Sequence, residues 1–312
     1  MSEKLIINGI EVLPGETKVI NFNIARLPSN TLIDLPVYIY RAKKEGAKLL
    51  ISAGMHGDEL NGTEIIRRLT TENRIKPNKG TVVVIPIINI YGFLLNSRYL
   101  PDGKDLNRTF PGRKLGSLAA RIAFTIMNEI LPIIDFGVDF HTGGANNNYP
   151  QIRCEIENDT NMKLAKAFNP PIIVNSVHRE GSFRKAANEH KKSILVFEGG
   201  ESLKFDELSI REGIKGIVRL MNYLGMTKKS VKKSKDIIIY ETSWIRSPLS
   251  GLFRSNVSCG DKVNPHQELG SVTDPFGEVE RKIKSKVEGI VIGLRSNPIV
   301  NRGDALFNLG ML

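Results

Sequence analysis

The amino-acid sequence predicts an α/β fold in which a mixed, mainly parallel sheet carries helices on both faces. Apolar segments of strand length alternate with segments whose apolar residues recur every three or four positions. Residues 81–90, TVVVIPIINI, are apolar almost throughout, which is typical of a strand covered on both faces of a parallel sheet. With 312 residues and 41% hydrophobic composition, the chain can bury a sizeable core.

The amino-terminal part is rich in predicted strands. Apolar segments at 5–7 and 19–24 are separated by Pro14-Gly15, and residues 35–41 alternate in polarity. The apolar run 49–53 follows after a polar turn. We therefore expect 35–41 and 49–53 to pair as a hairpin.

Helices and strands then alternate. The first helix is expected at about 58–69 and the clearest one at 117–130, where apolar residues recur every four positions. The later elements are strand 136–140, helix 160–168, strand 172–174, helix 182–190, strand 193–197 and helix 207–224. Ser182 is suited to cap its helix, and Gly225 can end the last one.

A polar loop at 91–113 shows little periodicity. Loops of about twenty residues inside a domain are usually functional or disordered. This loop contains Arg98, Asn107 and Arg108, which favours a functional role.

A domain boundary is predicted near residue 235. The lysine-rich run 228–235 reads as a solvated linker, and the residues after it form short strands with frequent glycine and no helical period. We expect a catalytic domain at 1–235 and a small all-β domain at 236–312.

Charge and composition limit the partners and the location. The net charge of +11 favours anionic partners, but the lysine run has no interleaved aromatic residues, so we expect no nucleic acid partner. No apolar run approaches the roughly 20 residues of a membrane helix, and the amino terminus lacks the order of a signal peptide. Cys154 and Cys259 are expected to be reduced thiols, partly or wholly buried, in a cytoplasmic protein. Association into a homo-oligomer stays open.

Three predicted strands end in residues that can bind or use a metal ion. They are His56 and Glu59 after strand 49–53, His141 after strand 136–140, and Glu198 after strand 193–197. A single His-x-x-Glu pair is weak, because helix surfaces carry many of them. Since ligands in such sheets bind beyond the carboxyl ends of the strands, three of these ends together indicate one site.

Two histidines and a carboxylate around an open position form the ligand set of hydrolytic zinc sites. His56, Glu59 and His141 supply that set, and Glu198 is suited to be a general base that does not bind the metal. Asp139 allows two interpretations, a carboxylate that orients a histidine or a merely buried polar group.

Three arginines are candidates for binding a carboxylate or a developing oxyanion. Arg98 and Arg108 lie in the long loop, where Asn107 accompanies them, and Arg184 lies on the helix before the Glu198 strand.

The motifs GMHGDELNG, NSRYLPDGKDLNRTFPG, DFHTGG and VFEGG occur in this order. Through them the sequence resembles the succinylglutamate desuccinylase/aspartoacylase family, relatives of the zinc carboxypeptidases, over essentially the whole chain. The resemblance implies a carboxypeptidase-like catalytic domain with one Zn²⁺ per chain, bound by His56, Glu59 and His141.

The same resemblance implies a reaction, the hydrolysis of a small N-acyl amino acid to a carboxylate and a free amine. Glu198 would activate water and protonate the leaving amine, and Arg98 would help to polarise the scissile carbonyl. Asn107 and Arg108 would hold a substrate carboxylate, and Arg184 would also contact the substrate.

One position departs from the aspartoacylase branch. Where that branch has a tyrosine four residues before the substrate-contacting arginine, this sequence has Glu180 before Arg184. An added acidic group disfavours N-acetylaspartate and N-succinylglutamate, and it favours an N-acetylated diamino acid with a cationic end.

The carboxyl-terminal segment resembles the lipoyl/biotinyl-like β-domain found at the end of many family members. Carrier domains need a lysine at a hairpin tip, and the expected tip, 274–277, has none. We expect a domain that narrows the site entrance or mediates assembly.

Two alternatives remain. The first is a zinc carboxypeptidase acting on peptides, and the second is a catalytically inactive protein that binds a metal or an anion. The sequence also leaves open a divalent metal other than zinc.

Overall fold

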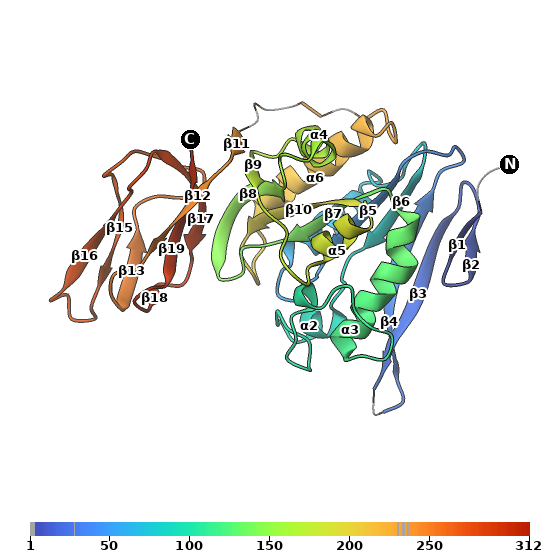
Figure 1. Cartoon of the computed structure of the whole chain (residues 1–312), viewed down its shortest axis with the longest axis horizontal. Coiled ribbons are helices and arrows are strands. Elements are labelled where there is room, and N and C mark those ends of the chain that lie inside the picture. The colour runs from blue at the N-terminus through green and yellow to red at the C-terminus, as the bar shows by residue number, and fades with distance from the viewer. Residues whose placement is uncertain (1–3, 28, 230, 233–234, 236) are drawn as a thin grey trace.

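The computed structural model describes residues 4–27, 29–229, 231–232, 235 and 237–312. A large α/β body is joined at one end to a part built from strands alone (Figure 1). The predicted linker 228–235 contains residues 230, 233 and 234, which lie outside this description. Within the described residues, no helix is long and apolar enough to cross a membrane.

One mixed sheet of 13 strands runs through the body, which confirms the predicted fold class. From β8 to the edge strand β3, the spatial order is β8 (Asn146–Cys154), β10 (Ser193–Gly200), β7 (Phe136–His141), β5 (Lys48–Ala53), β6 (Thr81–Ile85), β4 (Leu32–Arg41) and β3 (Thr17–Arg26). Strands β10, β7, β5 and β6 run parallel, whereas β8, β4 and β3 are antiparallel to their neighbours in this path. A separate hairpin of β1 (Leu5–Ile7) and β2 (Ile10–Val12) lies beside β3 (Figure 1).

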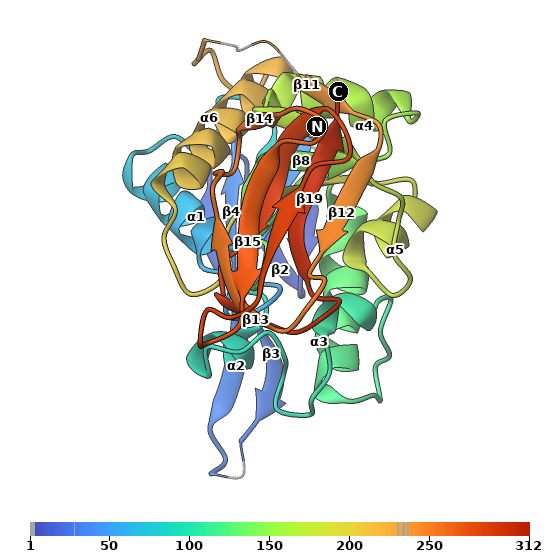
Figure 2. The same ribbon diagram turned by 90° about the vertical axis from the view of Figure 1, so that its left-hand side faces the viewer.

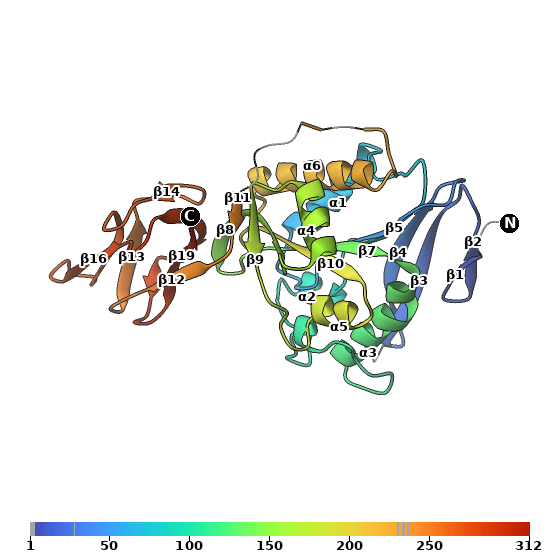
Figure 3. The same cartoon turned by 45° about the horizontal axis from the view of Figure 1, so that its top comes forward.

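Helices cover both faces of this sheet because successive strand side chains point to opposite sides. Leu49 and Ile51 of β5 pack with α1 (Asn61–Thr71), α4 (Asp159–Phe168) and α6 (Glu207–Tyr223). Leu50 packs on the other face with α3 (Leu118–Thr125) and α5 (Phe183–Glu189). Figure 3 shows the two groups of helices on opposite sides of the strands.

The predicted hairpin of 35–41 with 49–53 is wrong. Strand β4 pairs with β3 on one side and β6 on the other, so β6 separates it from β5. Residues 49–53 are all buried, as a central strand of the sheet requires. The crossover through α1 brings β6 back beside β5 in parallel, and this pairing takes the place of a local hairpin.

Several predicted boundaries also shift. Strand β6 ends at Ile85, because Pro86 cannot donate a ladder hydrogen bond. Helix α1 begins at Asn61, and the predicted helix 117–130 continues beyond α3 as a π-helical segment, η2 (Ile126–Ile130), followed by η3 (Leu131–Ile133). The loop at 91–113 contains most of the short helix α2 (Ile90–Leu94) and all of the 3-10 turn η1 (Leu106–Arg108).

The carboxyl-terminal part contains its own antiparallel sheet. In spatial order its strands are β16 (Glu280–Lys284), β15 (Glu268–Thr273), β13 (Gly251–Ser255) and β18 (Ile299–Val300). The tip 274–277 lies between β15 and β16, and Phe276 there is exposed.

Other carboxyl-terminal strands extend the main sheet. Strand β17 (Gly289–Arg295) pairs with β8, and β19 (Ala305–Met311), β12 (Thr242–Arg246) and β14 (Lys262–Val263) continue from it. Strand β11 (Ile237–Ile239) pairs with β9 (Ile172–Asn175). Figure 2 views the molecule from this end, with the carboxyl-terminal strands in front of the body. The pairing of β8 with β17 therefore continues the main sheet from the body into the carboxyl-terminal part.

Candidate metal centre and active site

The site lies at the carboxyl ends of three adjacent parallel strands, as the sequence predicts. Glu198 of β10 and His141 of β7 are register partners, and β5 runs on the other side of β7 and leads into His56. A cavity of about 280 Å³ opens there, and His56, Glu59, His141 and Glu198 all line it.

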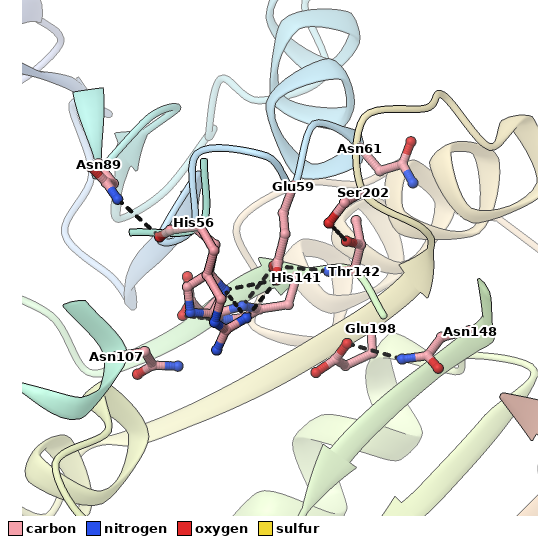
Figure 4. A network of polar contacts seen from close by, with 12 residues as sticks. His56, Glu59, Asn61, Asn89, Asn107, His141, Thr142, Asn148, Glu198 and Ser202 are labelled. Atoms are coloured by element: carbon pink, nitrogen blue, oxygen red, sulfur yellow. Dashed lines mark hydrogen bonds and ion pairs between the residues drawn. The ribbon is translucent and has the colours of Figure 1, made fainter. Parts of the chain in front are cut away.

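Glu59 joins the two histidines. Its Oε1 lies 2.7 Å from Nδ1 of His56, and its Oε2 lies 2.9 Å from Nδ1 of His141 (Figure 4). The backbone N–H of Thr142 also donates to Oε2, at 3.0 Å. Candidate ligand atoms of the three residues lie within 4.8 Å of one another, and all three side chains are buried.

The turn that carries this pair needs glycine at position 57. A Cβ there would lie 1.8 Å from the backbone carbon of Gly92, so the loop passes too close to α2 for any side chain.

The outer nitrogen of each histidine contacts an aspartate. Nε2 of His141 lies 2.8 Å from Asp139, which in turn accepts a hydrogen bond from Ser52 at 2.7 Å. Nε2 of His56 lies 3.2 Å from Asp105. Of the two interpretations of Asp139, the structure therefore supports the orienting carboxylate. No role was predicted for Asp105 itself, although it stands in the DLNR motif of the loop that was expected to be functional.

These contacts fit a bound divalent metal. Because the aspartates engage both Nε2 atoms, each histidine turns Nδ1 towards Glu59 and the other histidine, and carboxylate–histidine–metal arrangements have this form. Two imidazole nitrogens and a carboxylate oxygen are donors that suit zinc.

The electrostatics of the site favour a cation. Burial lowers the pKa of His141, but the nearby charges of Asp139 and Glu59 outweigh it, and that pKa is raised well above its usual value. Burial raises the pKa of Glu59, yet the two histidines more than offset this, so the pKa is lowered and the carboxyl stays ionised. Protons and a metal ion would therefore compete for the same buried negative charge.

Arg98 borders the metal ligands. It donates to Asp105 through Nε at 3.1 Å and Nη2 at 2.8 Å, and its Nη1 lies 3.5 Å from Glu59. This guanidinium is thus held beside the place where a metal would bind.

Asn107 and Arg108 line the same cavity. The side-chain oxygen of Asn107 accepts a hydrogen bond from the backbone N–H of Phe183 at 3.0 Å, which ties the long loop to α5. Arg108 Nη1 donates to the backbone oxygen of Asn107 at 2.6 Å.

Arg184 also lines the cavity, but both of its terminal nitrogens already donate hydrogen bonds. It donates to the backbone oxygens of Arg153 and Val177, at 3.0 and 2.8 Å, and to Ser176. Glu180, by contrast, is not a lining residue. Its side chain is 89% exposed and pairs with Lys185, so it does not face a substrate in this cavity.

Sequence reasoning missed several lining residues, four of which matter most here. They are Asn148 and Arg153 on β8, Arg179 in the loop before α5, and Trp244 on β12. Asn148 Nδ2 donates to Oε2 of Glu198 at 3.1 Å (Figure 4), and Nη1 of Arg153 lies 3.7 Å from Oε1. Strand β8, which carries Asn148 and Arg153, was not predicted because its sequence NNNYPQIRC is largely polar.

Comparison with known sequences gives two matches. A family model described as "Succinylglutamate desuccinylase/Aspartoacylase catalytic domain" matches residues 45–224. The N-alpha-acetyl-L-2,4-diaminobutyric acid deacetylase of Halomonas elongata is 27% identical over 290 residues, covering 87% of this chain and 84% of that protein.

Among solved structures, the product-bound ectoine utilization protein EutE (DoeB) from Ruegeria pomeroyi has a TM-score of 0.83 and 23% identity, with 95% of each chain covered. A succinylglutamate desuccinylase/aspartoacylase from Rhodobacter sphaeroides has a TM-score of 0.81 and 22% identity, with 94% of each chain covered. These likenesses support the fold.

Proposed function

Because the chain belongs to the succinylglutamate desuccinylase/aspartoacylase family, we propose that it is a zinc-dependent deacylase that hydrolyses the amide bond of a small N-acyl amino acid. The observation that carries this proposal is the buried set of His56, Glu59 and His141, with Glu198 in the same cavity. The cavity volume of about 280 Å³ lies near the lower end of ligand sites and suits a small substrate.

His56, Glu59 and His141 would hold one zinc ion per chain. When bound, zinc polarises a carbonyl and lowers the pKa of a bound water to about 7.

Glu198 would act as general base and then as general acid. Its carboxylate takes a proton from the attacking water as the oxygen–carbon bond forms, and it returns that proton to nitrogen as the carbon–nitrogen bond breaks. Arg98 lies beside the proposed metal ligand Glu59. From there its guanidinium would stabilise the negative charge that develops on the acyl oxygen.

Asn107 and Arg108 would bind the carboxylate of the amino acid. Arg108 offers a guanidinium at the cavity wall, and Asn107 fixes the loop that carries it. A substrate contact of Arg184 stays a prediction, since its guanidinium donates to the chain around it.

The first candidate substrate is N-acetyl-2,4-diaminobutyrate, because a relative is a deacetylase of that compound. Glu180 does not supply the expected acidic partner for its free amine.

An acidic N-acyl amino acid is a second candidate, favoured by the charge of the cavity wall. Arg98, Arg108, Arg153, Arg179 and Arg184 line it, against Glu59, Asp139 and Glu198. Burial and the charges of Arg108 and Arg153 lower the pKa of Arg179, as expected where cations crowd together. Since Glu180 faces away, the objection to N-acetylaspartate loses its structural basis.

The test is metal content and hydrolysis in the same preparation. We expect about one zinc per chain by elemental analysis in the wild type, and loss of zinc in His56→Ala. The zinc-loaded protein should release amine from N-acetyl-2,4-diaminobutyrate or from an acidic N-acyl amino acid such as N-acetylaspartate faster than from dipeptides. Preferred turnover of dipeptides would support a carboxypeptidase, and failure to take up zinc would refute the hydrolase.

We also propose a cytoplasmic location, supported by the free state of Cys154 and Cys259. Homo-oligomer formation stays a prediction, to be measured by light scattering of the purified chain.

A further inference from the structure

We propose that Asn148 and Arg153, both on β8, hold the carboxylate of Glu198 in the orientation needed for catalysis. They would be positioning residues, because both contact the base. The inference rests on the proposed role of Glu198 as general base.

The two residues contact different oxygens of the carboxylate. Asn148 Nδ2 donates to Oε2 at 3.1 Å, and Nη1 of Arg153 lies 3.7 Å from Oε1. A carboxylate held at both oxygens cannot turn about its last side-chain bond without losing one contact. Water and the leaving nitrogen would then meet the same oxygen atoms in every turnover.

An irregularity in β8 makes this arrangement possible. Residues five apart in a regular strand point to opposite faces. Here Glu198 pairs with Gln151 and Gly200 with Asn148, so β8 spans three positions where β10 spans two. The extra residue falls at Tyr149-Pro150, and it turns Asn148 to the side on which Arg153 faces the base.

The side chain of Asn148 is tightly enclosed. It is 6% exposed and lies between Gly143, which follows β7, and Gly293 of β17. A Cβ at Gly143 would lie 2.9 Å from Cγ of Asn148, and one at Gly293 would lie 3.0 Å from Oδ1. A side chain at Gly143 or at Gly293 would therefore crowd the amide of Asn148.

Arg153 is suited to the second contact. Its Nε is buried and, among the residues that the structure describes, has no hydrogen-bond partner. Its backbone oxygen accepts a hydrogen bond from Arg184 at 3.0 Å, which fixes the chain at this point. The guanidinium lines the cavity, and its ion-pair distance of 3.7 Å is to Glu198.

The enclosure links the base to the carboxyl-terminal part. Gly293 is the register partner of Asn148 across the β8–β17 pair. A change at Gly293 would reach Glu198 through Asn148 without touching the substrate or the metal ligands.

The experiment compares zinc content, kcat, KM and crystal structures of Asn148→Ala, Arg153→Gln, Arg153→Lys and Gly293→Ala. Asn147→Ala is the matched control, since Asn147 is the neighbour on the same strand and does not line the cavity. We expect zinc content to stay unchanged, KM to change less than about 3-fold, and kcat to fall about 10- to 100-fold in Asn148→Ala. In Arg153→Gln the fall in kcat should be smaller, and Arg153→Lys should have a higher kcat than Arg153→Gln. The kcat of Asn147→Ala should match that of the wild type.

The crystal structures give a readout that does not depend on turnover. In Asn148→Ala the Glu198 carboxylate should rotate or become disordered. An unchanged kcat in both Asn148→Ala and Arg153→Gln, or a Glu198 carboxylate that keeps its place in both, would overturn the inference. If Asn148→Ala does not fold, the kcat and the Glu198 orientation in Arg153→Gln and Gly293→Ala decide whether the inference holds.

A zinc-loaded wild type that hydrolyses none of the substrates would refute the proposed function. The orientation of Glu198 in the variant crystals would still show whether β8 holds it.

Discussion

Replacing Asp139 by asparagine should weaken zinc binding without unfolding the protein. Asp139 and His141 are 2% and 4% exposed, and Oδ2 lies 2.8 Å from Nε2. Asparagine keeps the size and an acceptor oxygen, but it removes the charge that makes the imidazole a stronger ligand. Removing such a partner typically costs about 10- to 100-fold in metal affinity, which corresponds to about 1.4 to 2.8 kcal/mol.

The assay is a zinc titration in competition with a chromophoric chelator, with circular dichroism to confirm folding. Asp135→Asn is the matched control, because that carboxylate lies just before the same strand and accepts from the backbone N–H of Lys48 at 2.8 Å. Ser52→Ala, which removes the hydrogen bond to Asp139, should give a smaller loss in the same direction. A zinc affinity within about 2-fold of the wild type in folded Asp139→Asn would refute the reasoning.

Three other predictions follow from contacts outside this pair. Asp105→Asn should lower both zinc affinity and kcat, because this carboxylate holds His56 and Arg98 together; a loss in neither quantity would contradict the geometry. Hydrogen bonds from Arg67, and then from Arg68, lower the pKa of Glu64 to about 2. A depressed carboxyl pKa stabilises the folded state above about pH 4.5 and loses that effect as the pH falls towards 2. Glu64→Gln should therefore cost about 1 kcal/mol of unfolding free energy at pH 7 and nothing near pH 2, measured by urea unfolding. Burial raises the pKa of the two cysteine thiols to about 11 and about 12, so a thiol reagent at pH 7 should label them slowly in the native state and fully in urea. Fast labelling of the native protein would contradict the burial of the two thiols.

The ends of the parallel strands were predictable because each one is a local signal. An apolar run that stops at a histidine or glutamate marks both the strand and its functional end, and this pattern located His56, His141 and Glu198. Side chains that follow separate strands converge because the sheet is parallel, so the convergence also needed no knowledge of distant contacts.

Pairing between distant strands was not predictable from local patterns. Residues 35–41 and 49–53 have the spacing of a hairpin, yet β6 lies between them, because the crossover through α1 returns β6 to the edge of β5. Strand β8 has little apolar alternation, and its pairing with β10, β17 and β9 holds it in the sheet. The roles of Asn148 and Arg153 depend on that strand and were missed with it.

The strand pairing between β8 and β17 has a consequence for protein engineering. Residues 45–224 carry the family match, but the wall of the cavity also includes Trp244, and Gly293 packs against Asn148. A chimera that keeps the first 235 residues and borrows the rest from a relative would therefore inherit a different pocket rim and a different support for the strand beside the base. Libraries aimed at new acyl or amino acid preferences should sample these late positions together with the early motifs.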